Sequence, residues 1–233
     1  MSYTYSSLVT ILAERLSVSA TDADFLTDLP TIIDDAEQRC YRDLDLLATV
    51  VRDQSATTTA NSRTFTLPTA SGRFVVLDEV SVMVNSVRYP CVRASKEVID
   101  YLWPGETAAT ASTIPNQFAM ISDQTIIFGP PPGGTWTVEC IGTIRPAALS
   151  ASNTTTFLTS YLSDLFLAAC MVSATGGLLR NYGAASDDPR MAISWDGEYN
   201  KRLASANAEE MRRRYGSSSW IAKTPQSAIS ERQ

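Results

Sequence analysis

The stretch from Thr156 to Arg180 constrains the fold more than any other part of the sequence. Its apolar side chains recur at the three- and four-residue spacing of a helix, with polar residues between them. Asp164 and the pair Gly176-Gly177 keep the apolar run short of the ~18 to 20 residues that a bilayer span needs. The stretch therefore predicts one long helix in a protein core, which the rest of the chain covers or extends.

The size and the beginning of the chain indicate a globular protein made in a cytoplasm. With 233 residues, of which 44% are hydrophobic, the chain can bury a substantial core as one domain or as two small lobes. Residues 1–16 lack a basic start, and Glu14 and Arg15 interrupt their apolar character. We therefore expect neither a signal peptide nor a membrane anchor.

The cysteines and histidines limit the chemistry that the chain can carry. The sequence has no histidine, which excludes Ser-His-Asp and Cys-His nucleophile pairs and imidazole metal ligands. The four cysteines are far apart at positions that otherwise look buried, which favours reduced core thiols over a disulfide framework. A zinc site of four thiolates is a remote alternative. These cysteines are Cys40, Cys91, Cys140 and Cys170.

Charge is uneven along the chain. The net charge is −6, and Lys and Arg outnumber Asp and Glu only in residues 201–233. An acidic body argues against a surface that grips a phosphate backbone, because such surfaces are built from clustered Lys and Arg. The basic end could instead meet an acidic protein partner.

The first part of the chain predicts two helices. One runs from Thr4 to Leu16, with Thr4 as its cap, and a short acidic turn from Asp22 to Asp28 follows. The second starts at Pro30, a favoured first-turn residue, and extends to Leu47. Its Asp34-Asp35 pair is explained by the helix dipole and solvation more simply than by an acid-base role.

From Ala48 onward the sequence pattern repeats every two residues, as in a β-strand, and predicts a set of strands joined by tight turns. Asn85-Ser86 and Ser122–Gln124 are expected to be hairpin turns, and a short helix is expected at Ser95–Leu102. Trp103 is either a lid over the sheet or an exposed contact anchor. Gly133-Gly134 lacks the Lys and Ser/Thr of a phosphate-binding loop. The expected strands are Ala48–Gln54, Arg63–Leu67, Phe74–Val84, Val87–Val92, Gln117–Ile121, Thr125–Phe128 and Thr135–Arg145.

The end of the chain predicts a second long helix and a tail. Asp187-Asp188-Pro189 signals a helix start, and the helix should run to Tyr215 and pack antiparallel on the helix from Thr156. Arg212–Arg214 either complement its C-terminal dipole or form a partner-binding patch. The tail Gly216–Gln233 is expected to be disordered alone, yet Trp220-Ile221 is typical of a segment that docks on a partner.

Together these elements predict an α+β fold: a helical bundle with long C-terminal helices plus a mostly antiparallel β-hairpin sheet insertion. The expected organisation has N-terminal helices in residues 1–47 and a β-rich lobe in 48–146. A long helical hairpin in 147–215 packs on the N-terminal helices, and residues 216–233 form a flexible tail.

The order of these elements resembles the head-to-tail adaptor (connector or neck) proteins of tailed, short-tailed bacteriophages, over residues 5–215. The inserted Thr69–Arg73 and the tail beyond Tyr215 depart from the family pattern. The stretches that carry the resemblance are Ala36–Arg39 with Arg42–Leu44, Phe65–Pro68, Ile114–Phe118, Ile126–Pro132 and Phe157-Leu158.

The resemblance implies a structural virion protein without catalytic activity, cofactor or metal. It implies a dodecameric ring under the portal protein, joined below to a tail or nozzle protein, through which genomic DNA passes without specific binding on its way to ejection. Such a protein would assemble in the host cytoplasm and become part of the virion neck, with no membrane contact. The helical hairpin Phe157–Tyr215 would supply the ring and portal-facing side. The candidate interface residues are Arg212, Arg213, Arg214, Tyr215, Trp220 and Ile221.

Two other functions remain open at this stage. One is another neck or tail protein, such as a stopper or a tail-completion factor, although these are often smaller and richer in β-structure. The other is a cell-wall glycosidase, which needs only two carboxylates in a cleft and no histidine. Its candidates are Glu79, Glu97, Asp100 and Glu106, but no spacing singles out a pair.

Overall fold

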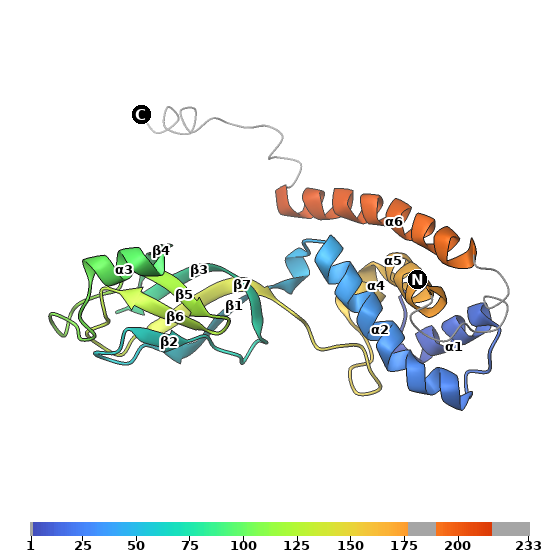
Figure 1. Cartoon of the computed structure of the whole chain (residues 1–233), viewed down its shortest axis with the longest axis horizontal. Helices are drawn as coiled ribbons and strands as arrows, with labels where there is room; N and C mark the ends of the chain where they lie inside the picture. Colours follow the sequence, from blue (N-terminus) through green and yellow to red (C-terminus); the bar gives the residue numbers. More distant parts are fainter. Residues whose placement is uncertain (1, 177–189, 216–233) are drawn as a thin grey trace, which may run out of the picture. The chain divides into compact units, whose positions relative to one another are not determined.

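The computed structural model describes residues 2–176 and 190–215. Residues 48–146 form one compact unit, which holds the strands. The described residues before and after this segment form a second, helical unit (Figure 1). None of the helices in the described part of the chain is long and apolar enough to cross a membrane.

The first helix of the helical unit, α1, spans Tyr5–Leu16 and confirms the prediction. The Thr4 hydroxyl accepts a hydrogen bond from the backbone N–H of Ser7, and the Ser7 side chain accepts one from the N–H of Thr4. This reciprocal cap satisfies two backbone donors that a helix start would otherwise leave unpaired. Leu8, Leu12 and Leu16 are buried, so one face of α1 packs on the core.

The second helix, α2, spans Ala23–Asp43, so the predicted start at Pro30 is wrong. Asp22 caps the helix by accepting a hydrogen bond from the N–H of Phe25 at 2.9 Å. The acidic segment expected to be a turn is therefore the first part of the helix. Pro30 lies inside α2, where its missing N–H leaves the Leu26 carbonyl without a helical donor. Both residues are exposed, so water can bind this carbonyl.

The expected single helix from Thr156 is in fact divided. Helix α4 spans Phe157–Tyr161 and α5 spans Ser163–Thr175, because the backbone of Leu162 leaves the helical region at φ −120° and ψ 36°. Residues 165–171 of α5 are all buried, so α5 is the central helix of the unit. The prediction of a core helix is confirmed for α5, while the end expected at Arg180 lies outside the described residues.

Helix α6 spans Arg190–Tyr215 and packs along α5 (Figure 1). Its 26 residues correspond to a length of about 39 Å at 1.5 Å per residue. Tyr199 and Ala206 are buried, and Trp195 and Leu203 are partly buried against the same core. The predicted start signal, Asp187-Asp188-Pro189, lies outside the described residues.

The strands form one seven-stranded sheet with the order β1-β7-β3-β4-β5-β6-β2. Neighbouring strands are antiparallel except β4 and β5, which run parallel because the chain crosses over between them through α3, Lys96–Leu102. The strands are β1 Val50–Thr57, β2 Thr64–Thr66, β3 Phe74–Val84, β4 Val87–Arg93, β5 Gln117–Ser122, β6 Thr125–Gly129 and β7 Thr137–Ile144.

The predicted fold class is therefore wrong in two respects, although both α and β structure are present. The described residues contain six α-helices, of which only α6 is a long C-terminal helix, and the 21-residue α2 is N-terminal. The sheet is mixed and continuous over seven strands rather than a β-hairpin insertion. The break at Leu162 and the parallel pairing of β4 with β5 are the physical causes of the difference.

In the sheet unit, the predicted Asn85-Ser86 turn and one of the two interpretations of Trp103 agree with the structure. Asn85 and Ser86 have φ of 50° and 66°, the left-handed pair that a two-residue hairpin turn requires, and this turn was predicted. Trp103 is partly buried on Ile99, Ala119 and Ile127. Its ring lies over Gly129, where a Cβ atom would be 2.5 Å from the Trp103 Cε3 atom. These contacts favour the lid interpretation of Trp103.

The four cysteines are free and buried, which confirms that they are core residues. Burial raises the pKa of the Cys40, Cys91 and Cys140 thiols to about 12, so they are protonated at neutral pH. In the described part of the chain no group of His, Cys, Asp and Glu side chains has a metal-binding arrangement.

Candidate functional site

The C-terminal end of α6 is tied to its own unit through a buried carboxylate. Glu210 is buried and accepts a hydrogen bond from the backbone N–H of Leu47 at 3.1 Å. Arg213, one turn later, donates to the other oxygen of Glu210. The two donors satisfy the hydrogen-bonding capacity of this buried carboxylate, and these contacts fix the end of α6 against the segment that follows α2.

The three predicted interface arginines have different surroundings. Arg214 donates to the Asp45 carboxylate at 2.5 Å and to the Asp45 carbonyl at 3.0 Å. Arg213 pairs with Glu210, whereas Arg212 is exposed and makes no hydrogen bond or ion pair with any described residue. All three lie in the last turn of α6, where positive charge complements the helix dipole. Of the three, Arg212 is the one that is available to a partner.

An aromatic stack lies beside this helix end. The Arg213 guanidinium lies over the Phe157 ring at 5.0 Å from its centroid, and the Phe157 and Tyr161 rings stack with centroids 5.0 Å apart and planes at 28°. Thr156 caps α4 by accepting from the N–H of Thr159, which fixes the start of the helix that carries both rings. We call Arg213, Phe157 and Tyr161 the aromatic ladder. Phe157 belongs to the stretch that carried the family resemblance, but its contact with Arg213 could not be seen in the sequence.

The predicted tail residues cannot be placed in the same way. Tyr215 is the last residue of α6, whereas Trp220 and Ile221 lie outside the described residues. The structure therefore brings together Arg212, Arg213, Arg214 and Tyr215 at one helix end and says nothing of the other two.

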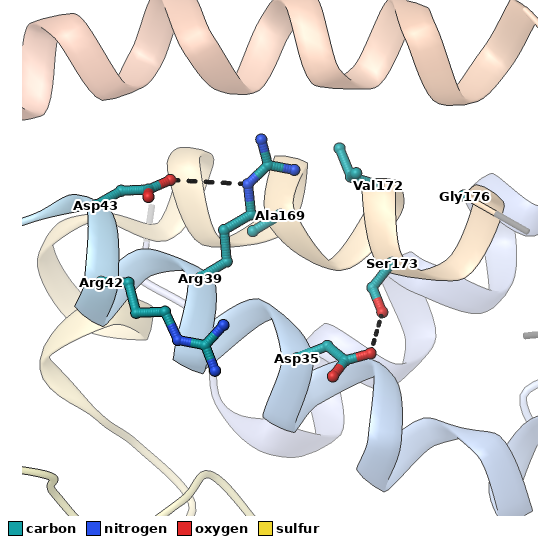
Figure 2. Close-up of a pocket in the computed structure, with 8 residues that line it drawn as sticks. All are labelled: Asp35, Arg39, Arg42, Asp43, Ala169, Val172, Ser173 and Gly176. Carbon is teal, nitrogen blue, oxygen red and sulfur yellow. Dashed lines mark hydrogen bonds and ion pairs between the residues drawn. The ribbon is translucent and has the colours of Figure 1, made fainter. Parts of the chain in front are cut away.

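A pocket of about 470 Å³ is lined by charged side chains of α2 on one side and by Ala169, Val172 and Ser173 of α5 on the other (Figure 2). Arg39, on its wall, pairs with Asp196 of α6 at 2.6 Å and lies 4.0 Å over the Tyr199 ring. Asp35 accepts a hydrogen bond from Ser173 of α5 at 3.2 Å. The neighbouring carboxylates Asp34 and Asp35 therefore have different partners, since Asp34 accepts a hydrogen bond from Gln38 on its own helix. These partners fit a structural role that holds three helices together.

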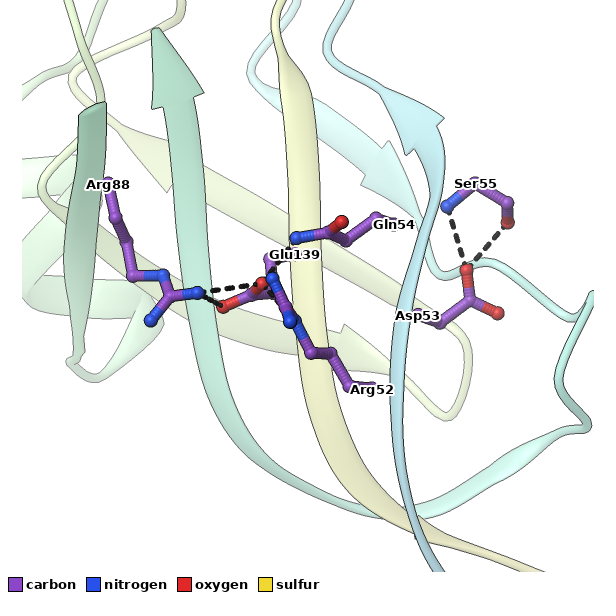
Figure 3. Close-up of polar contacts among 6 residues, drawn as sticks. All are labelled: Arg52, Asp53, Gln54, Ser55, Arg88 and Glu139. Atoms are coloured by element: carbon purple, nitrogen blue, oxygen red, sulfur yellow. Dashed lines mark hydrogen bonds and ion pairs between the residues drawn. The ribbon is translucent and has the colours of Figure 1, made fainter. Parts of the chain in front are cut away.

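The sheet unit contains a buried carboxylate, Glu139 of β7, among three donors (Figure 3). Arg52 and Gln54 of β1 donate to it from one side, and Arg88 of β4 donates from the other at 2.9 Å and 3.0 Å. Burial acts to raise the pKa of Glu139, but the hydrogen bonds from Arg52 and Gln54 and the positive charges outweigh it and lower the pKa. The cluster joins strands on both sides of β7 across one face of the sheet.

The four glycosidase candidates do not form an acid-base pair. Asp100 pairs with Lys96 and with Arg63, which also lies 3.9 Å from Glu106. The hydrogen bond from Lys96 lowers the pKa of Asp100, and its own backbone N–H and the Ser95 hydroxyl lower that of Glu97. A general acid needs the opposite shift. Glu79 lies on β3, whereas Glu97 and Asp100 lie on α3.

Comparison with known proteins identifies one family. The sequence model of the family described as SU10 adaptor protein matches residues 3–222. The match covers both compact units and extends past the end of α6. Comparison with curated proteins gives no match.

Proposed function

Because this chain belongs to the SU10 adaptor protein family, we propose that it forms a ring beneath the phage portal and joins the capsid to the tail. The family match confirms the resemblance to phage head-to-tail adaptors. The chain is accordingly a phage adaptor protein, a structural component of the virion. The match across residues 3–222 is the observation that carries the proposal.

In the proposed ring, twelve copies surround a channel through which the genomic DNA passes without specific binding. A net charge of −6 supports this proposal, since an acidic subunit repels the phosphate backbone instead of holding it. A closed ring requires two complementary surfaces on each copy, related by a rotation that closes. A tail or nozzle protein would bind the opposite side of the ring, after assembly in the host cytoplasm.

The proposed portal-facing side is the one built from α4, α5 and α6, with the tail after Tyr215. The anchored end of α6 supports this choice, because Glu210 and Arg214 hold it in a fixed orientation and Arg212 stays exposed. A rigid helix end that carries an available cation is a suitable base for a segment that orders on binding. Trp220 and Ile221 would then provide the apolar contact with the portal.

Native mass spectrometry of the protein with the portal of its own phage tests this proposal. We expect twelve copies to bind each portal. A folded chain that never binds the portal would contradict the adaptor function and favour a tail-completion role. The titration should be repeated with a chain that ends at Tyr215 and with a Trp220→Ala, Ile221→Ala variant.

Both variants should bind the portal at least about tenfold more weakly, the effect of losing a central aromatic contact. Circular dichroism should show an unchanged fold. Tyr101→Ala is the matched control, because this exposed tyrosine lies on α3 in the sheet unit. Unchanged binding of both tail variants would remove the tail from the mechanism while leaving the ring itself in place.

A further inference from the structure

The chain passes between the two compact units twice, and a buried glutamate holds it near each crossing. The first crossing follows Leu47 and the second precedes Ala147. The backbone N–H of Leu47 donates to Glu210 of α6, and that of Leu149 donates to Glu37 of α2, each at 3.1 Å. Both carboxylates are buried within the helical unit. The two leucine amides therefore report on the two crossings in a matched way.

The last turn of α6 holds the chain just before the first crossing. Leu47 is the first residue of a 3₁₀ turn, Leu47–Thr49, a position whose N–H has no acceptor inside the turn. Glu210 supplies that acceptor from α6. Arg214 donates to the carboxylate of Asp45 at 2.5 Å and to its carbonyl at 3.0 Å. One helical turn thus binds the segment Asp45–Leu47 at both of its ends.

These contacts depend on one another, because all of them join the same two pieces of chain. If the last turn of α6 frays, Leu47 loses its acceptor and Asp45 loses its cation together. If the segment moves away, Glu210 keeps Arg213 as its remaining donor. Contacts that are lost in one movement open cooperatively.

The second crossing is held from elsewhere in the helical unit. Besides the bond to Glu37, the side-chain amide of Asn153 donates to the carbonyls of Ala147 and Ala148 at 2.7 Å and 3.1 Å. Glu37 lies on α2, and Asn153 precedes α4. Fraying of α6 removes neither the acceptor of Leu149 nor the donor from Asn153.

We propose that Glu210 and Arg214 of α6, with Asp45 and Leu47, form a latch on the first crossing that opens as one unit and independently of the second crossing. An acidic partner that takes Arg214 from Asp45 would then loosen the chain where it enters the sheet unit, because a ligand shifts the equilibrium of the element it contacts. The latch does not depend on the ring or on the portal, since all its contacts lie within the helical unit of one chain.

Amide hydrogen exchange of the full chain, followed by NMR, tests the latch with two surface variants. Arg214→Gln should speed exchange of the Leu47 amide about threefold, although the bonds of Arg214 go to Asp45. Asp45→Asn should speed exchange of the Arg213 amide by a similar factor, the size expected for a partly exposed ion pair. The Leu149 amide should keep its rate in both variants.

Two further variants are the controls. Lys201→Gln removes an exposed ion pair with Glu198 in the middle of α6 and should change neither leucine amide. Asn153→Ala should speed exchange at Leu149 and leave Leu47 unchanged. An unchanged Leu47 rate in Arg214→Gln, or an unchanged Arg213 rate in Asp45→Asn, would overturn the proposal, because the contacts would then break one by one. Equal acceleration at Leu47 and Leu149 would overturn the independence of the two crossings.

Discussion

Glu37 in the helical unit and Glu139 in the sheet unit are both buried carboxylates, but their surroundings affect their charge in opposite ways. Glu37 of α2 is 3% exposed and accepts one hydrogen bond, from the backbone N–H of Leu149 at 3.1 Å. Glu139 of β7 is 1% exposed and accepts from Arg52, Gln54 and Arg88. The comparison shows that the donors around a carboxylate, rather than its burial, decide which charge state the fold favours.

The pKa values of the two groups move in opposite directions. Burial raises the pKa of Glu37 to about 7, since the single bond from Leu149 lowers it less and Asp34 raises it further. Burial also acts to raise the pKa of Glu139, but the hydrogen bonds from Arg52 and Gln54 and the arginine charges leave it below the ordinary value of 4.5. The fold thus favours the protonated form of Glu37 and the ionised form of Glu139.

The directions of these two pKa shifts determine how the contribution of each carboxylate to the free energy of unfolding changes with pH. Glu37 binds its proton more tightly in the folded chain, so its contribution is complete below pH 4.5 and is lost as the pH rises through about 7. Glu139 releases its proton more readily in the folded chain, so its contribution is present above pH 4.5 and is lost as the pH falls. The two units therefore gain stability at opposite ends of the acidic range.

The largest expected effect is that of Glu139→Gln. At pH 7 this change should lower the free energy of unfolding of the sheet unit by about 3 kcal/mol, because Arg52 and Arg88 lose the negative charge of the carboxylate that both contact. Hydrogen exchange of the β1 and β7 amides measures it within the unit. The loss should shrink below pH 4.5, where the native carboxyl becomes protonated.

Asp123→Asn is the matched control for this change. Asp123 pairs with Arg73 in the same unit, but both side chains are exposed, so the loss should stay below about 0.5 kcal/mol. Equal losses for the two variants would mean that burial of Glu139 adds nothing to the strength of its contacts.

Glu37→Gln should have the opposite sign and a smaller size. The amide oxygen can still accept from Leu149, and the variant no longer carries a buried charge. At pH 8 we expect the free energy of unfolding of the helical unit to rise by about 2 kcal/mol, below the limit of about 3 kcal/mol that the pKa shift sets. Thermal unfolding at pH 8 and pH 4.5 measures the difference, which should nearly vanish at the lower pH.

Glu14→Gln on α1 provides the comparison for this variant. Glu14 is exposed, so its replacement should change the stability little at either pH. A stabilisation by Glu37→Gln that did not depend on pH would contradict the assignment of the effect to the charge of Glu37.

The smallest effects are expected for the arginines that flank Glu139. Both are half-exposed, so Arg52→Ala and Arg88→Ala should each lower the stability of the sheet unit by about 1 kcal/mol at pH 7. The double variant should exceed the sum by about 1 kcal/mol, because Glu139 then loses both cations while it stays buried. A double-mutant cycle by urea unfolding measures this coupling, and strict additivity would show that the two arginines act independently.

Local signals in the sequence predicted much of the secondary structure. Thr4 as a cap, the Asn85-Ser86 turn and the strand Phe74–Val84 all depend on neighbouring residues, and the structure has them as expected. The predicted start of α2 at Pro30 is wrong because Asp22 is the stronger N-cap signal and Pro30 lies inside the helix. The break at Leu162 has no glycine or proline to mark it.

The buried carboxylates could not be recognised by residue type, since Glu is usually solvated. The sequence does contain a signal for the burial of Glu37, because this residue lies four residues after Ile33 and three before Cys40, on the buried face of α2. For Glu139 the partners come from β1, which pairs with β7, and from β4, which lies one strand further on beyond β3, and only the sheet order brings these strands near Glu139. The anchoring of α6 through Glu210, Leu47 and Arg214 likewise joins segments that are far apart in the chain.

The position of the sheet unit within the chain also decides the order of events during synthesis. The helical unit needs α1 and α2 from the beginning and α5 from near residue 170, and the whole sheet unit is made in between. At roughly 5 to 20 residues per second, the ribosome takes on the order of ten seconds to pass from the end of α2 to the end of α5. The sheet unit can therefore complete its hydrogen bonds while Phe25, Leu29 and Ile33 still lack the helix that covers them. Until α5 has been made, those side chains lack their native cover in every newly made chain.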